Sequence, residues 1–170
     1  MKRIAIVCIL TGFLCGASRG AMLGGGTREV SVSGSLDQDD TTILTLAFTG
    51  GYFIQNALEV GGSLELETAG RAYTRTHAGG FVEWNWDTKL PIVPYLGTYV
   101  GVVYASLEDE ASNTAFEWSG WGGAKCYLLE NLAFGAQMQV WMANDDIYVT
   151  GIGEHGSSEW GFVLRTSFYF

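Results

Sequence analysis

A histidine and a serine separated by one residue near the C-terminus have the clearest potential for chemistry. His155 could act as a general base toward the hydroxyl of Ser157, and Glu154 or Glu159 could orient the imidazole. That arrangement would suit a hydrolase. The pair lies in a polar, glycine-containing stretch rather than clearly on a strand, which favours a loop. We therefore expect no catalytic residues, and keep His155 and Ser157 as the alternative in which the protein is an enzyme.

The same stretch, Gly151–Gly156, matches the pattern G-x-G-x-x-G. That pattern binds phosphate only where it joins a strand to a helix. No helical pattern follows it here, and Glu154 would repel a phosphate group. The sequence therefore predicts a loop at this position rather than a nucleotide site.

The two histidines, His77 and His155, are potential metal ligands, and both are expected in external loops. Acidic clusters occur in the loops as well, but none shows the ligand spacing of a dedicated cation site. We expect solvated loop charge, no metal site and no cofactor. The clustered acids are Asp37, Asp39, Asp40, Asp145 and Asp146.

Composition limits what kind of protein could carry these residues. The chain has 170 residues, of which 48% are hydrophobic and only 16% charged, so disorder and a coiled coil are excluded. The length suggests one domain. The formal net charge of −9 argues against nucleic acid as a partner.

The N-terminus has the pattern of a secretory signal peptide. Met1–Arg3 is basic, Ile4–Leu14 is mostly apolar, and small residues precede Ala21 at the positions a signal peptidase requires. Cleavage there would remove two of the three cysteines and leave Cys126, so the mature chain could form no intramolecular disulfide. The predicted organisation is a signal peptide at 1–20, a flexible leader at 21–26 and a barrel domain at 27–170.

Alternation of apolar and polar residues between turn clusters recurs along the mature chain and predicts strands. In the last segment Trp160, Phe162 and Leu164 share one face, and Val163 and Arg165 share the other. Short and long connections also alternate, as in outer-membrane barrels. The eight expected strands are about Arg28–Leu36, Ile43–Ile54, Ala57–Glu67, Gly79–Trp86, Val93–Ser106, Ala115–Leu128, Leu132–Met142 and Trp160–Phe170.

The polar faces of these strands carry too few charges for a typical soluble surface, so we expect the apolar faces to meet lipid and the polar faces to line a lumen. An unpaired charge in a narrow lumen is costly, so acids should pair with bases there. Eight strands leave little more room than side chains fill, which favours a plugged interior over a conduction path. We expect Lys125 and Arg165 to face inward and bridge some of the inward glutamates Glu59, Glu65, Glu67, Glu83 and Glu117.

Four stretches resemble the small eight-stranded bacterial outer-membrane β-barrel family, which includes the OmpA transmembrane domain and OmpX. Gly51–Gly61 is similar to its strand–turn–strand hairpin, Pro94–Gly101 to its fifth strand, and Glu130–Ala133 to its third periplasmic turn. The C-terminal strand resembles the family's signal for the outer-membrane assembly machinery, although Thr166 departs from the pattern. The residues of this expected assembly signal are Phe162, Leu164, Phe168 and Phe170.

The resemblance implies an all-β fold, an eight-stranded antiparallel up-and-down transmembrane barrel in a Gram-negative outer membrane. We expect a structural or surface-interacting protein with acidic external loops, whose partners are outer-membrane lipids, lipopolysaccharide, the assembly machinery and an unidentified extracellular partner. Some barrels of this size deacylate lipid A with a His-x-Ser pair, but Ser158 stands here where that group has an asparagine. A soluble periplasmic barrel of lipocalin type remains the further alternative.

Overall fold

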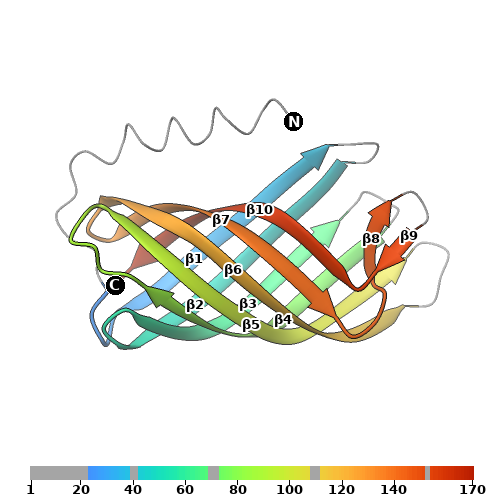
Figure 1. The fold of residues 1–170 in the computed structure, drawn as a ribbon, viewed down its shortest axis with the longest axis horizontal. Coiled ribbons are helices and arrows are strands. Elements are labelled where there is room, and N and C mark those ends of the chain that lie inside the picture. Colours follow the sequence, from blue (N-terminus) through green and yellow to red (C-terminus); the bar gives the residue numbers. More distant parts are fainter. Residues whose placement is uncertain (1–22, 39–41, 69–72, 108–111, 152–153) are drawn as a thin grey trace.

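A computed structural model describes residues 23–38, 42–68, 73–107, 112–151 and 154–170. Within them, eight antiparallel strands form a closed barrel in the order β1-β10-β7-β6-β5-β4-β3-β2, and a separate two-stranded hairpin, β8-β9, lies beyond one end (Figure 1). The predicted fold class is confirmed. The barrel strands are β1 Arg28–Gln38, β2 Thr42–Gln55, β3 Leu58–Thr68, β4 Tyr73–Asn85, β5 Ile92–Leu107, β6 Asn113–Leu129, β7 Leu132–Ala143 and β10 Ser158–Tyr169; the hairpin is β8 Tyr148–Gly151 and β9 Glu154–Gly156.

The barrel closes between its first and last strands, where Glu29 pairs with Tyr169 and Gly34 with Leu164. The tight β2–β3 turn lies at the same end as the described termini, because the amide of Phe53 donates to the carbonyl of Thr27. Ala57 in this turn has φ of 70°, a conformation that tight hairpin turns require. The β7–β10 connection, which contains the β8–β9 hairpin, lies at the opposite end (Figure 1).

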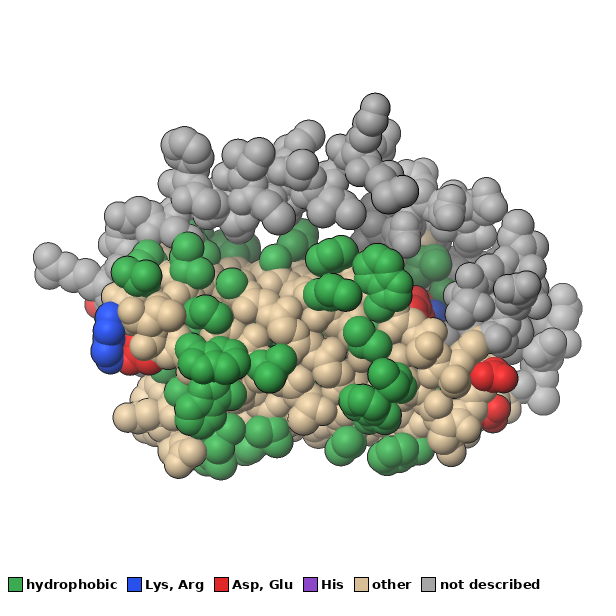
Figure 2. Space-filling model, viewed as in Figure 1, with side chains coloured by type: hydrophobic (Ala, Val, Ile, Leu, Met, Phe, Trp, Pro, Cys, Tyr) green, Lys and Arg blue, Asp and Glu red, His purple; other side chains and the backbone are tan. Residues whose placement is uncertain are grey.

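Side chains alternate across the barrel wall as the sequence predicts. In β10, Phe162 and Leu164 face outward and are exposed, whereas Val163 and Arg165 face inward and are buried. Hydrophobic side chains cover the wall, and the charged side chains of the described residues appear near its two ends (Figure 2). Closure pairs every barrel strand on both sides, so the polar groups of the backbone are satisfied within the wall.

The structure corrects the start of one strand. The prediction placed residues 68–78 in a long loop, but β3 continues to Thr68 and β4 begins at Tyr73. His77 was therefore wrongly placed in an external loop: it lies on the inner face of β4 and is 4% exposed. Tyr73–Ala78 has polar residues on both faces, so its alternation carries no apolar signal.

The predicted signal peptide lies outside the described residues. Of the predicted leader, Leu23 is buried against the β2–β3 turn, and the amide of Gly26 donates to the carbonyl of Phe53. Cys126 is buried on β6, and the prediction that it can form no intramolecular disulfide concerns a chain without residues 1–20. The described residues include no helix of the length and apolarity needed to cross a membrane.

Candidate functional site

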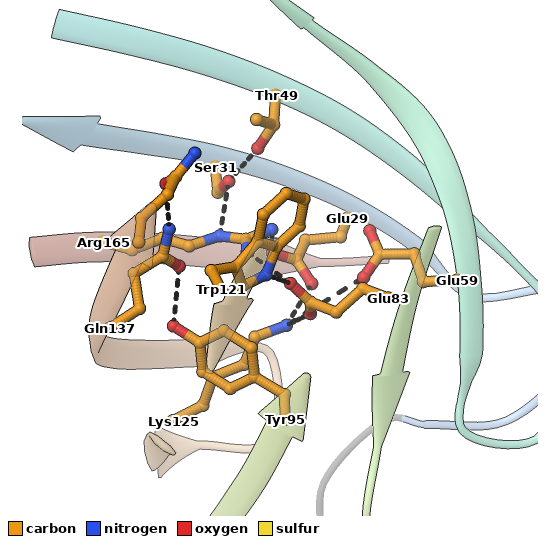
Figure 3. A network of polar contacts seen from close by, with 11 residues as sticks. Glu29, Ser31, Thr49, Glu59, Glu83, Tyr95, Trp121, Lys125, Gln137 and Arg165 are labelled. Carbon is orange, nitrogen blue, oxygen red and sulfur yellow. Dashed lines mark hydrogen bonds and ion pairs between the residues drawn. The ribbon is translucent and has the colours of Figure 1, made fainter. Parts of the chain in front are cut away.

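The barrel interior holds a first charged cluster (Figure 3), nearer the end where the described part of the chain begins and ends. Lys125 Nζ lies 2.6 Å from Glu83 Oε1, 3.0 Å from Glu29 Oε2 and 3.9 Å from Glu59 Oε2. Arg165 contacts two of the same acids, with Nη2 2.7 Å from Glu29 Oε1 and Nη1 2.8 Å from Glu83 Oε2. All five side chains are almost fully buried. Three acids face two bases, so the cluster carries one excess negative charge when all are ionised.

Neighbouring polar groups bind the same charges. The indole Nε1 of Trp121 donates to Glu83 Oε2 over 3.0 Å, and Arg165 Nε donates to Ser31 Oγ over 2.9 Å. Lys125 Nζ also lies 5.0 Å from the ring centroid of Tyr95, within range of a cation–π interaction. These contacts come from five different strands, so the network ties the barrel together across its lumen (Figure 3).

Glycines on the inner face make room for these side chains. A Cβ at Gly97 would lie 2.3 Å from the indole of Trp121, and one at Gly51 would lie 1.7 Å from a carboxylate oxygen of Glu59. Both side chains therefore lie flat against the wall of a neighbouring strand. A larger residue at either glycine would displace a member of the network.

A second charged cluster lies nearer the end with the β8–β9 hairpin. Arg75 Nη1 is 3.1 Å from Glu159 Oε2, its Nε donates to Glu67 Oε1 over 3.1 Å, and Tyr73 OH donates to the same oxygen over 2.6 Å. His77 Nδ1 is 2.8 Å from Glu117 Oε1. The inward-facing residue directly across from His77 on β3 is Glu65. The residues of this outer cluster are Glu65, Glu67, Tyr73, Arg75, His77, Glu117 and Glu159.

Aromatic and apolar layers separate and cap the two clusters. Phe81, Tyr95, Tyr99 and Trp121 pack together in the interior. The end with the termini is filled by Leu23, Phe53, Val93, Tyr127, Ala133 and Tyr169, and the other end by Val103, Ala115 and Ile147. A cavity of about 50 Å³ remains between the clusters, with Glu65, His77, Glu117, Trp121 and Arg165 among its lining residues.

The predicted interior residues divide between the two clusters. Lys125 and Arg165 lie with Glu83, and Lys125 also approaches Glu59. The other predicted acids, Glu65, Glu67 and Glu117, contact neither base and belong to the outer cluster. Glu29, Arg75 and His77 are further interior residues that the sequence did not predict. An excess of inward acids over inward bases was the available signal that further bases were needed.

The His-x-Ser pair offers no catalytic geometry in the described part of the chain. Ser157 is exposed between β9 and β10. The side chain of His155 lies outside the described residues. The G-x-G-x-x-G segment spans the β8–β9 hairpin and leads into strand β10 rather than a helix, which removes the context that phosphate binding requires.

The acidic loop residues are partly described. Asp145 is exposed and accepts a hydrogen bond of 2.9 Å from Asn113 Nδ2, which holds the pKa of Asp145 below its usual value. Asp146 is also exposed, whereas Asp39, Asp40 and the side chain of Asp37 lie outside the described residues.

Two groups of side chains bring enough ligand atoms together for a metal ion. Glu29, Glu59 and Glu83 form one, and Glu65, Glu67 and His77 form the other. In the first group the bases Lys125 and Arg165 already neutralise most of the charge. Only the second group offers a nitrogen ligand.

Comparison with known proteins bears on the fold. No protein-family model and no curated protein matches the chain. The N-terminal β-barrel domain of Pseudomonas aeruginosa OprF aligns with a TM-score of 0.58 and 17% identity, covering 86% of this chain and 99% of that one. Neisserial surface protein A aligns with a TM-score of 0.57 and 14% identity, covering 84% of this chain and 93% of that one. Outer membrane protein OprG from P. aeruginosa aligns with a TM-score of 0.50 and 16% identity, covering 91% of this chain and 99% of that one. The chain therefore has the eight-stranded antiparallel barrel fold of small bacterial outer-membrane proteins.

Proposed function

We propose that the protein is an integral outer-membrane β-barrel whose role is structural or surface-interacting, and whose lumen is plugged by ion pairs. The observation that carries the proposal is the inverted distribution of polarity. Glu29, Glu83, Lys125 and Arg165 are buried in the interior, whereas large apolar side chains such as Phe162 are exposed on the wall. Water would disfavour that wall, and lipid favours it.

The inverted polarity also weighs against the soluble lipocalin-type alternative. A soluble ligand-binding barrel places its apolar face inside and its polar face in water. Here Phe48, Leu96 and Val100 are each more than half exposed on the outer face, and the interior is charged. That lumen offers few apolar side chains for a small apolar ligand to contact.

The plug proposal follows from how the interior is filled. Side chains from β1, β4, β6 and β10 meet around Glu83, Lys125 and Arg165, and aromatic layers lie on either side. A continuous aqueous path would have to break several buried ion pairs. Interaction with external molecules is therefore assigned to the connections at the end opposite the termini, where exposed Asp145 and Asp146 lie.

The lipid A-modifying alternative finds little support. The names of the three similar structures describe an outer-membrane protein, a surface protein and a barrel domain, and none describes an enzyme. Ser157 lies in the exposed connection between β9 and β10.

The membrane proposal is tested by expressing the full chain, isolating outer membranes, and comparing boiled with unboiled samples on SDS gels. A folded membrane barrel resists SDS and migrates faster without boiling. We expect the protein in the outer-membrane fraction with that mobility shift. Recovery from the soluble periplasm, with identical mobility in both samples, would refute the proposal.

A further inference from the structure

Three potential metal ligands meet on the inner face of β3 and β4. Glu65 lies directly opposite His77 in the antiparallel register, and Glu67, two residues further along β3, points to the same face. Each residue contributes one ligand atom, and these three atoms lie within 4.8 Å of one another. Strand pairing therefore fixes the group on rigid backbone rather than on a loop.

The orientation of His77 points to a missing partner. Its Nδ1 lies 2.8 Å from Glu117 Oε1, which leaves Nε2 as the atom available to a ligand. Nε2 is buried and has no hydrogen-bond partner within the described part of the chain, and the residue is only 4% exposed. Burying a polar atom without a partner costs about 1–3 kcal/mol. A carboxylate on the far nitrogen of a histidine is also the usual support for a metal-binding imidazole.

Charge around this group favours a cation. Among the described residues of the outer cluster, the acids Glu65, Glu67, Glu117 and Glu159 face one arginine, Arg75. With a neutral imidazole the cluster carries three excess negative charges, against one in the inner cluster. A divalent ion would neutralise two of them.

We propose that Glu65, Glu67 and His77 Nε2 bind one divalent first-row transition metal ion, with Zn²⁺ as the representative. Imidazole with carboxylates suits Zn²⁺ and its neighbours better than Mg²⁺ or Ca²⁺, which prefer oxygen ligands alone. Glu117 is the positioning residue that holds His77 through Nδ1.

The ligand atoms and the space fit this assignment. Arg75 and Tyr73 bind Oε1 of Glu67, so Oε2 is its ligand atom. Bonds of about 2.0–2.2 Å would require the ligand atoms, which now lie within 4.8 Å of one another, to lie roughly 3.3 Å apart. The adjoining cavity of about 50 Å³, lined by Glu65 and His77, leaves room for water to complete the coordination.

The test is calorimetric titration of ZnCl₂ into the full chain, carried without a histidine tag, treated with chelator and folded in detergent. We expect one ion per chain. His77→Gln and Glu65→Gln should each weaken binding by at least about tenfold through loss of a ligand, and Glu117→Gln by about 10- to 100-fold through loss of the support on Nδ1.

Two matched controls separate this site from other sources of binding. His155→Gln removes the only other histidine in the sequence, and Glu59→Gln removes an acid from the inner cluster; both should bind Zn²⁺ as the native chain does. Mg²⁺ at the same concentrations should give no saturable heat. The gel mobility shift shows whether each variant is folded. Glu65→Gln is the variant that should disturb folding least, because Glu65 is only half-buried.

Either of two results would overturn the proposal. The first is the absence of saturable Zn²⁺ binding by the folded native chain, which would leave His77 as a protonated partner of Glu65 and Glu117. The second is binding that survives both His77→Gln and Glu65→Gln, or that disappears with His155→Gln. Neither result bears on the membrane location, which the fractionation measures separately.

Discussion

Lys125 is the side chain whose removal should most disturb the barrel interior. It is fully buried and contacts three acids, at 2.6, 3.0 and 3.9 Å. Lys125→Met preserves much of the volume but removes the charge. Arg165 would then face Glu29, Glu59 and Glu83 alone, so the excess negative charge of the inner cluster would rise from one to two.

The expected cost follows from leaving acids buried without a partner. Breaking a buried ion pair from one side costs about 3–5 kcal/mol, which corresponds to a change of roughly two to three and a half orders of magnitude in the unfolding equilibrium. The loss of the contact between Lys125 and the Tyr95 ring acts in the same direction. We therefore expect the free energy of unfolding to fall by an amount in this range.

The assay is urea unfolding in neutral phospholipid vesicles, followed by tryptophan fluorescence. Lys89→Met is the matched control, because Lys89 is 84% exposed and pairs only with Asp87 in a turn. We expect its unfolding midpoint to match that of the native chain. Similar midpoints for Lys125→Met and Lys89→Met would refute the assignment of Lys125 to the interior network.

A second change tests the electrostatic cause. Both carboxylate oxygens of Glu59 are buried without a hydrogen-bond partner among the described residues, so Glu59→Gln removes an acid from the cluster and breaks no hydrogen bond. With Glu59 ionised, adding this change to Lys125→Met returns the cluster to one excess negative charge. The double variant should therefore be more stable than Lys125→Met alone. A double variant of equal or lower stability would show that lost packing, rather than unbalanced charge, dominates.

Four further changes probe other parts of the structure. Glu59→Gln alone should change the free energy of unfolding by less than about 1 kcal/mol in the same urea titration, and a larger loss would mean that its 3.9 Å ion pair dominates the site. Gly97→Ala should cost about 1–3 kcal/mol, because its Cβ would lie 2.3 Å from the indole of Trp121; a native urea midpoint would contradict that packing. Val100→Arg, on the outer face in the middle of β5, should cost about 2–4 kcal/mol in vesicles, whereas a soluble barrel would tolerate it. Phe170→Ser should lower the amount of folded protein in isolated outer membranes if the terminal strand carries the assembly signal, and an unchanged amount on the unboiled gel would reject that role.

Strands with one apolar face could be predicted from the sequence, and strands without one could not. β10 was expected over Trp160–Phe170 and is found at Ser158–Tyr169, because its outer face is apolar throughout. The first half of β4 was missed because Thr74 and Thr76 face outward between Tyr73, Arg75 and His77. Near the end of a membrane barrel the outer face no longer meets hydrocarbon, so the alternation that identifies a strand weakens there.

The interior partners were harder to predict than the strands. Inward orientation follows from alternation along one strand, and Glu29 and Ser31 in fact alternate with Val30 and Val32. Which inward residues meet across the lumen depends on how far neighbouring strands are staggered around the barrel. Lys125 and Glu29 are 96 residues apart in the chain, so no local pattern brings them together.

The division of the charges into two clusters is a consequence of the same geometry. An apolar outer wall leaves the interior to be built from polar side chains, and these are stable there only where charges balance and hydrogen bonds are made. The inner cluster comes within one charge of that balance through Lys125 and Arg165. The outer cluster, with Arg75 as its arginine, has three excess negative charges while His77 is neutral; protonation of His77 lowers this excess to two, and a divalent cation lowers it to one. The excess of negative charge at the outer cluster is therefore the feature of this lumen that packing alone does not explain. The zinc titration measures whether a bound cation, rather than a proton on His77, offsets that charge.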